Sequence, residues 1–175
     1  MQNLNLNNKT LKVLLWGFGH MNKVILRYLI EKNHKIVAVI GHHNIGQNAY
    51  EIAGLSSSES VKITSDEHAQ DLILENRPDV CILATKSLIK EIYESLTLLG
   101  KNGISTITIA EEAFYSWYSS PTLTSELNAL FKSKNATFTG TGSQDIFWGF
   151  LPSSLVGSSH SINKIIGSGQ FNVGQ

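Results

Sequence analysis

The sequence has little of what disulfide-held, thiolate-metal or membrane-spanning proteins require. It contains one cysteine among 175 residues, which excludes an intrachain disulfide and a thiolate metal cluster. That cysteine, Cys81, stands inside the apolar run Val80–Ala84, so we expect it to be buried and reduced. No segment approaches the roughly 18 apolar residues of a membrane span. The first ten residues, MQNLNLNNKT, lack the apolar stretch of a signal peptide. The sequence therefore predicts a cytoplasmic protein.

Charge is also scarce. Fourteen Lys and Arg residues balance 14 Asp and Glu residues, and no segment is a run of basic residues. Surfaces that bind nucleic acids or anionic membranes usually carry clustered basic side chains. We therefore expect neither nucleic acid nor a membrane as a partner. We also expect no bound metal, because Cys81 has no second thiol with which to form a metal cluster. The partner we expect is a small molecule.

What the sequence does have is a regular alternation of short apolar runs with segments of helical period. The runs are apolar on both faces, as in a parallel sheet covered by helices. The predicted strands are Leu11–Phe18, Ile36–Ile40, Lys62–Thr64, Val80–Ala84, Ile104–Ala110 and Ala136–Thr139. The predicted helices are Met21–Lys32, Gly46–Leu55, Glu67–Asn76, Ser87–Leu99 and Thr122–Ser133, with Ser87 as a cap and Gly100 as a stop. This order indicates an α/β fold, a Rossmann-type doubly wound parallel sheet.

The composition changes near residue 142. Residues 143–175 are rich in Gly and Ser, with an apolar stretch Ile146–Val156 that Pro152 interrupts. The run Ile162–Gly167 resembles a strand without a later partner. We interpret 1–142 as a dinucleotide-binding domain and 143–175 as the beginning of a second, incomplete α+β domain for substrate binding and dimerisation. We expect this chain alone to lack turnover and to self-associate, and the full-length protein to be a homo-oligomer.

The strongest local motif is a glycine turn between the first predicted strand and the first predicted helix. It is typical of a dinucleotide fingerprint, in which pyrophosphate sits on a helix N-terminus. The predicted cofactor-binding residues of this turn are Gly17, Phe18, Gly19, His20 and Met21. Asn22 replaces the third glycine, which implies either a displaced helix or a side chain that reaches the phosphates.

The end of the second predicted strand bears on the choice between NAD and NADP. A site for NAD usually places Asp or Glu there, on the ribose 2′-hydroxyl. No acid occurs from Ile40 to Gln47, so NADP is favoured over NAD. His42 or His43 could bond or stack at the adenosine end, or both are ordinary exposed loop residues.

Further candidate residues follow the later strands, whose carboxyl ends line the ligand crevice of such folds. Ala84 and Thr85 are small enough to form a wall for a nicotinamide ring. Glu111 and Glu112 precede an aromatic segment, where a carboxyl group could have a raised pKa and exchange protons with an amine or imine. The alternative is that both acids begin a helix and offset its dipole.

Four segments together resemble a known family. LLWGFGHM, DVCILATKSLIKEIY, TITIAEEAFYSW and FTGTGSQDIFWGFLP are similar, in order and spacing, to the N-terminal half of the 2,4-diaminopentanoate dehydrogenases. That family is related to native amine dehydrogenases and, more distantly, to dihydrodipicolinate reductase. The resemblance implies an NAD(P)-dependent oxidoreductase that deaminates a small amine or diamine. It implies that the catalytic acid is Glu111 or Glu112.

The resemblance also assigns residues to the border of cofactor and substrate. The family's Gly-Thr-Gly element falls on Gly140 and Gly142, and the substrate side would be lined by Gln144, Asp145 and Trp148. The family continues this element with Asn-Pro-Gly, which is absent here, so the substrate is left open.

Two other functions stay open. One is a non-catalytic dinucleotide-binding fragment or sensor module. The other is an imine reductase like dihydrodipicolinate reductase, which is less favoured because the pair His42 and His43 lies in the wrong loop for its catalytic run.

Overall fold

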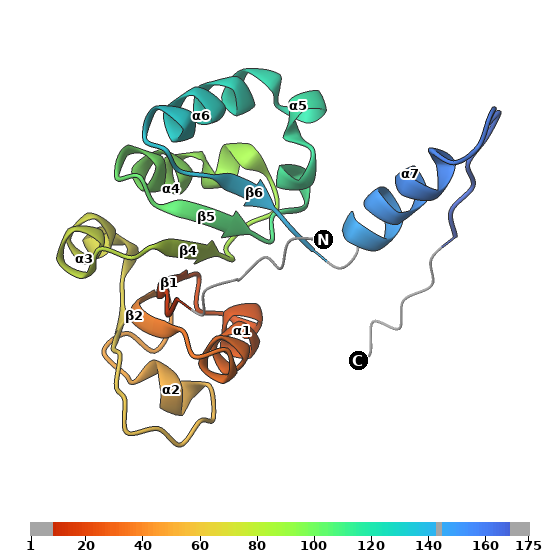
Figure 1. Cartoon of the computed structure of the whole chain (residues 1–175). Coiled ribbons are helices and arrows are strands. Elements are labelled where there is room, and N and C mark those ends of the chain that lie inside the picture. The colour runs from red at the N-terminus through yellow and green to blue at the C-terminus, as the bar shows by residue number, and fades with distance from the viewer. Residues whose placement is uncertain (1–8, 143–144, 169–175) are drawn as a thin grey trace.

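A six-stranded parallel sheet forms the centre of the molecule. The computed structural model describes residues 9–142 and 145–168. Within these residues the strand order is β3-β2-β1-β4-β5-β6, and every neighbouring pair is parallel (Figure 1). The strands are β1 Lys12–Trp16, β2 Lys35–Ile40, β3 Ile63–Thr64, β4 Val80–Leu83, β5 Ser105–Thr108 and β6 Phe138–Gly140. The predicted doubly wound α/β fold is confirmed, in the strand order of dinucleotide-binding folds.

Helices connect the strands and cover both faces of the sheet. The α-helices are α1 His20–Glu31, α2 Ala49–Ile52, α3 Ala69–Asn76, α4 Ile89–Lys101, α5 Ser116–Ser119, α6 Pro121–Ser133 and α7 Leu151–Val156. Shorter turns are the 3₁₀ segments η1 Asp66–His68 and η2 Glu111–Phe114 and the π-helical segment η3 Asp145–Phe150. No helix in the described part of the chain is long and apolar enough to cross a membrane.

The connections place α1 and α2 on one face of the sheet and α3, α4 and α6 on the other (Figure 1). From β1 the chain winds outward to β2 and β3, then returns past β1 to β4 and winds outward the other way. The carboxyl ends of β1 and β4 therefore flank the point at which the direction reverses. Ligands of open α/β sheets bind in the crevice at that point.

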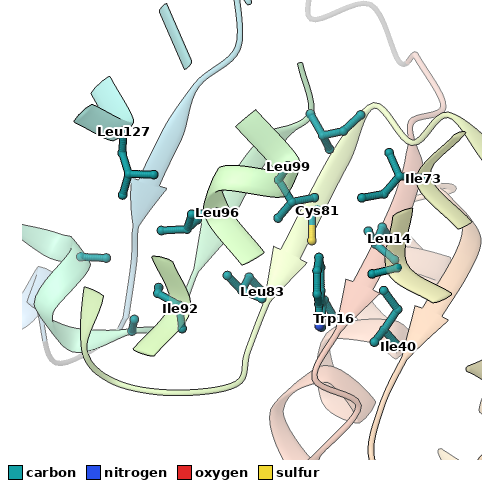
Figure 2. Close-up of a cluster of buried hydrophobic side chains, with 14 of the residues drawn as sticks. Leu14, Trp16, Ile40, Ile73, Cys81, Leu83, Ile92, Leu96, Leu99 and Leu127 are labelled. Carbon is teal, nitrogen blue, oxygen red and sulfur yellow. The ribbon is translucent and has the colours of Figure 1, made fainter. Parts of the chain in front are cut away.

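Each face of the sheet has its own apolar core. The core beneath α3, α4 and α6 contains Trp16, Cys81 and Leu96, all nearly or fully buried (Figure 2). Burial raises the pKa of the Cys81 thiol, because the thiolate would be poorly solvated there. The prediction of a buried, reduced Cys81 is confirmed.

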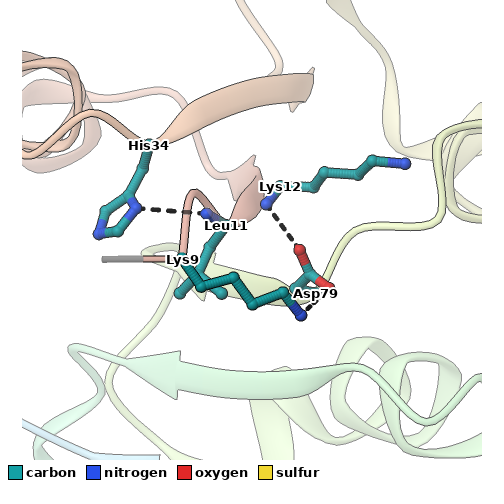
Figure 3. Close-up of polar contacts among 5 residues, drawn as sticks. All are labelled: Lys9, Leu11, Lys12, His34 and Asp79. Atoms are coloured by element: carbon teal, nitrogen blue, oxygen red, sulfur yellow. Dashed lines mark hydrogen bonds and ion pairs between the residues drawn. The ribbon is translucent and has the colours of Figure 1, made fainter. Parts of the chain in front are cut away.

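The end of the sheet opposite that crevice is tied together by polar contacts (Figure 3). Asp79 accepts a hydrogen bond of 2.8 Å from the backbone N–H of Lys12 and lies 3.9 Å from the ammonium of Lys9. The Nδ1 atom of His34 accepts from the N–H of Leu11 at 3.3 Å. These contacts fix where β1 begins between its two neighbours.

Two predicted features of α4 are wrong. The helix begins after Leu88, and the backbone N–H of Leu88 is bonded by Glu91, so Ser87 is not the cap. Gly100 lies inside the helix, where an added Cβ would come within 2.8 Å of the Phe131 ring. The absence of a side chain at Gly100 allows α4 to pack closely against α6. The residue with a left-handed conformation after the helix is Gly103, with φ +70°.

The strand predicted at Ile162–Gly167 is also wrong. This segment is irregular, and Ile162, Ile165 and Ile166 are exposed. A strand requires a neighbour for its backbone groups, and α7 carries the chain away from the sheet (Figure 1). The apolar stretch before it forms η3 and α7, in which Phe150 and Leu155 are exposed.

Candidate functional site

The glycine turn after β1 lies at the carboxyl edge of the sheet, in contact with the end of β4. Gly17 has a φ of +87°, and a Cβ atom on it would lie 2.4 Å from the carbonyl oxygen of Ala84. The backbone N–H groups of Gly17 and Phe18 both donate to the carbonyl of Ile40, at 2.9 and 3.1 Å. Gly17 is thus required by both conformation and space, and the turn is bonded to β2 as well.

Gly19 differs from Gly17, because neither a left-handed conformation nor a lack of space requires a glycine there. Its φ is −90°, and no atom lies within 4 Å of a Cβ built on it. Gly19 is the N-cap of α1, yet no side chain caps this helix and no acid occurs in its first turn. The first N–H groups of a helix lack partners within the helix and, with the helix dipole, favour an anion. The open space at Gly19 suits a phosphate group lying close to the backbone.

The other predicted residues of the turn divide by exposure. His20 and Met21 are exposed beside Gly19 at the start of α1. Phe18 is 8% exposed and belongs to the core beneath α1 and α2. Its side chain therefore supports the turn by packing.

Of the two alternatives expected for Asn22, a side chain that reaches the phosphates is wrong. Its side chain is fully buried, and its Nδ2 donates to the carbonyls of Trp16, Gly17 and Ile82 at 3.1, 3.1 and 3.3 Å. An amide thus replaces the third glycine by bonding α1 to the ends of β1 and β4. The side chain is directed into the sheet, away from a phosphate at Gly19.

A cleft of about 370 Å³ opens beside this turn on the α3 and α4 face. It joins the ends of three strands with the first residues of η1 and the side of α4. The lining residues are Trp16, His42, Asp66, Ala69, Thr85, Lys86, Glu91, Glu94, Ser95 and Leu98. His42 and Thr85, both predicted cofactor-binding residues, come together here, whereas His43 is exposed next to His42 in the chain.

Asp66 is one of the residues of this cleft that sequence reasoning missed. Its Oδ1 accepts from the indole Nε1 of Trp16 at 2.5 Å, and its Oδ2 lies 3.1 Å from Nε2 of His42. The available signal was its position two residues after the predicted third strand. Because β3 pairs with β2, with Ile40 opposite Thr64, residues two beyond each strand end are neighbours.

Glu111 and Glu112 are adjacent in η2 but differ in exposure and in hydrogen bonding. The carboxylate of Glu112 accepts from the backbone N–H of Ile89 at 2.5 Å and from the Ser120 hydroxyl at 2.6 Å. Burial by itself raises the pKa of Glu112, but the hydrogen bonds from Ser119, Ser120 and Ile89 outweigh it and lower the pKa below its ordinary value. Glu111 is exposed. Of the two, Glu112 holds the beginning of α4.

Gly140 has a structural reason to be glycine. A Cβ on it would lie 2.3 Å from the carbonyl carbon of Ala113, so η2 lies directly against the end of β6. Thr141 donates its N–H to the Thr108 carbonyl at 2.9 Å, which extends the pairing of β6 with β5, and Gly142 is half-buried. This pair of glycines lies at the same edge of the sheet as the turn after β1.

The predicted substrate-side residues lie at the limit of what the structure describes. Gln144 lies outside the described residues, and Asp145 and Trp148 belong to the backbone of η3, with side chains that are not described. Gly149 of η3 lies against the ring of Phe114, to which an added Cβ would come within 2.9 Å. No group of three or more potential metal ligands occurs among the described residues.

Comparison with solved structures identifies the relatives of this arrangement. The amine dehydrogenase of Mycobacterium smegmatis superposes with a TM-score of 0.81 and 31% identity over 89% of this chain. At the level of the family, the chain matches the N-terminal half of an amine dehydrogenase. It covers 46% of that amine dehydrogenase, and therefore spans about half of its length.

More distant structures share the fold alone. Dipicolinate-bound dihydrodipicolinate reductase from Paenisporosarcina sp. TG-14 matches with a TM-score of 0.59 and 18% identity, over 85% of this chain and 54% of the reductase. A protein named RSP, in complex with β-NAD⁺ and operator DNA, matches with a TM-score of 0.57 and 14% identity, over 87% of this chain and 64% of RSP. No protein-family model matches the chain, and no curated protein does.

We expect substitutions of the two glycines of the turn to destabilise the fold to very different extents. Gly17→Ala forces a left-handed conformation and a clash with the Ala84 carbonyl, so we expect a loss of at least about 2 kcal/mol in the free energy of unfolding. Gly19→Ala meets open space and loses only the preference of an N-cap for glycine, so it should lower this free energy by about 1 kcal/mol or less. Urea unfolding of both variants measures this. Equal losses would contradict the assigned geometry.

The lowered pKa of Glu112 predicts that its contribution to the free energy of unfolding depends on pH. Its pKa is lowered in the folded state, so its contribution is present above its ordinary pKa and is lost as the pH falls through the folded-state pKa. Glu112→Gln should reduce the free energy of unfolding by about 1 kcal/mol at pH 7, with the deficit shrinking below about pH 4. Glu111→Gln, the adjacent exposed acid, is the matched control. A deficit independent of pH, or one shared by the control, would contradict this role.

Proposed function

We propose that the chain is the nicotinamide-dinucleotide-binding half of an oxidoreductase that acts on the CH–NH₂ group of a small amine or diamine. The observation that carries the proposal is the uncapped start of α1, with open space at Gly19, at the point where the sheet reverses direction. The 31% identity to an amine dehydrogenase supports the substrate class. A cytoplasmic location stays a prediction.

The residues present fit the pyrophosphate and adenosine parts of a dinucleotide. The N–H groups of His20 and Met21 would bind the pyrophosphate at the start of α1. The cleft beside Trp16 and His42 would take the adenosine. Thr85, half-buried at the end of β4, lines the β4 side of this same cleft and would face the part of the dinucleotide that leads towards the nicotinamide. When bound, the nicotinamide supplies the acceptor for a hydride at its C4 atom.

The chemistry to be supported is an oxidative deamination. The substrate carbon loses a hydride and its ammonium group loses a proton, which leaves an iminium; water then adds, and ammonium departs to give the carbonyl product. The protein has to orient the carbon and accept the proton. We propose that the carboxylate of Glu111 accepts this proton, because the Glu112 carboxylate is already bonded to Ile89 and Ser120. Glu112 would then be a positioning residue.

We propose that residues 143–175 lead into a second domain that completes the substrate pocket. Leu151 and Leu155 of α7, and Phe150 at the end of η3, are exposed apolar residues, and α7 stands apart from the sheet (Figure 1). Exposed apolar surface of this kind is usually covered by another part of a protein. Gln144, Asp145 and Trp148 stay predictions for the substrate side, and a homo-oligomer stays a prediction for the complete protein.

The preference for NADP rested on the absence of an acid in the loop after β2. The fold brings the Asp66 carboxylate to that loop, 3.1 Å from His42. The argument from the loop sequence therefore no longer favours NADP, and the cofactor is proposed at the level of a nicotinamide dinucleotide.

The binding site is tested by Gly19→Val. A branched side chain there meets no protein atom but would occupy the position proposed for the pyrophosphate. Affinity for NADH or NADPH should fall at least about tenfold, and the free energy of unfolding should fall by no more than the roughly 1 to 2 kcal/mol of a poorer N-cap. Gly157→Val, at an exposed glycine after α7, is the control. Calorimetric titration that gives Gly19→Val the wild-type affinity would refute the site.

The activity is tested on the 175-residue chain beside the longest polypeptide expressed from the same reading frame. The longer polypeptide should reduce the cofactor with small amines and diamines, followed by absorbance, and should not act on cyclic imines. The 175-residue chain should bind the cofactor without turnover. Activity with cyclic imines alone would favour the reductase instead. Binding without turnover by every polypeptide of the frame would favour a sensor module.

A further inference from the structure

We propose that Asp66 makes this site select NAD(H) over NADP(H), acting from the turn after β3 in place of the missing acid after β2. The inference rests on the proposed dinucleotide site and deepens it. It concerns one carboxylate and the 2′ position of the adenosine ribose.

The first argument is position. His42 stands two residues beyond the end of β2, where an NAD site normally has its acid. Asp66 stands two residues beyond the end of β3, and the N–H of Gly41 donates to the Thr64 carbonyl at 2.9 Å, so the two strand ends run side by side. The Asp66 carboxylate consequently reaches His42 at 3.1 Å. An acid from the next strand thus occupies the space that the β2 loop leaves open.

The second argument is orientation. The Trp16 indole donates to one carboxylate oxygen at 2.5 Å and His42 contacts the other at 3.1 Å, so the group is held from both sides. Its side chain is still 36% exposed. A carboxylate has about four acceptor positions, and two are used here. The remaining ones can accept from ribose hydroxyl groups.

The third argument is charge. The cleft is lined by three carboxylates, those of Asp66, Glu91 and Glu94. The possible cations among its lining residues are Lys86 and His42. His42 is already engaged with Asp66, so it offers no unopposed charge to a phosphate. A 2′-phosphate would bring up to two further negative charges beside Asp66. The repulsion between charges in direct contact is large in a partly buried site. A 2′-hydroxyl brings none.

The experiment is calorimetric titration of the 175-residue chain with NADH and with NADPH. The wild type should bind NADH about tenfold or more tightly than NADPH. Asp66→Asn keeps the shape and an acceptor for Trp16 but removes the charge, and should bring the two affinities to within about twofold. Glu67→Gln, the exposed acid next in the chain and not a lining residue, should leave the wild-type ratio unchanged.

The dependence of cofactor affinity on ionic strength distinguishes an electrostatic role of Asp66 from a purely structural one. Screening weakens the repulsion, so NADPH affinity relative to NADH should rise with ionic strength in the wild type and not in Asp66→Asn. The wild-type titrations alone test for repulsion in the cleft, and the comparison with Asp66→Asn assigns that repulsion to Asp66 among the three carboxylates.

The outcomes separate the two proposals. Tight binding of NADPH equal to or better than NADH by the wild type overturns the role of Asp66 and leaves the proposed function standing. A change in the ratio of NADH to NADPH affinity that is as large in Glu67→Gln as in Asp66→Asn also overturns the role of Asp66. Binding of neither cofactor refutes the proposed function, and the role of Asp66 with it.

Discussion

The contact between the turn after β1 and the end of β4 determines what the rest of this structure can do. Gly17 lies against the Ala84 carbonyl with no room for a side chain, and Asn22 bonds the start of α1 to both strands. These two residues fix the direction of α1 at the reversal point of the sheet. The helix start is thereby left open, and the cleft beside Trp16 takes its shape from the same strand ends.

The fold could be predicted because its signals are local. Strands buried on both faces, such as Val80–Leu83, consist almost wholly of apolar residues, and amphipathic helices separate them. Where a residue has two possible roles, local sequence was insufficient. Gly100 looked like a helix stop but serves the packing of α4 on α6, and Ile162–Gly167 has a strand's composition without a neighbouring strand.

The candidate site was predictable in its glycines and less so in its charges. The turn from Gly17 to Met21 is contiguous in sequence, so its motif was visible. The positions of Asp66 and Glu112 depend on register and on hydrogen bonds to residues more than 20 positions away, namely Trp16 and Ile89. Such contacts follow from the strand order, which no single segment encodes. Two adjacent glutamates therefore appeared equivalent in sequence although only one of them is bonded.

The bonding of Glu112 has a consequence for how this sequence can vary. Its carboxylate joins three separate stretches of chain: η2, the first turn of α4 at Ile89, and Ser120 before α6. A substitution at 112 leaves the hydroxyl at 120 and the amide at 89 without their acceptor at once, so tolerated changes at 112 and 120 should occur together in related sequences. Glu111 has no such bonds to preserve among the described contacts, so the folded structure places no comparable constraint on variation there.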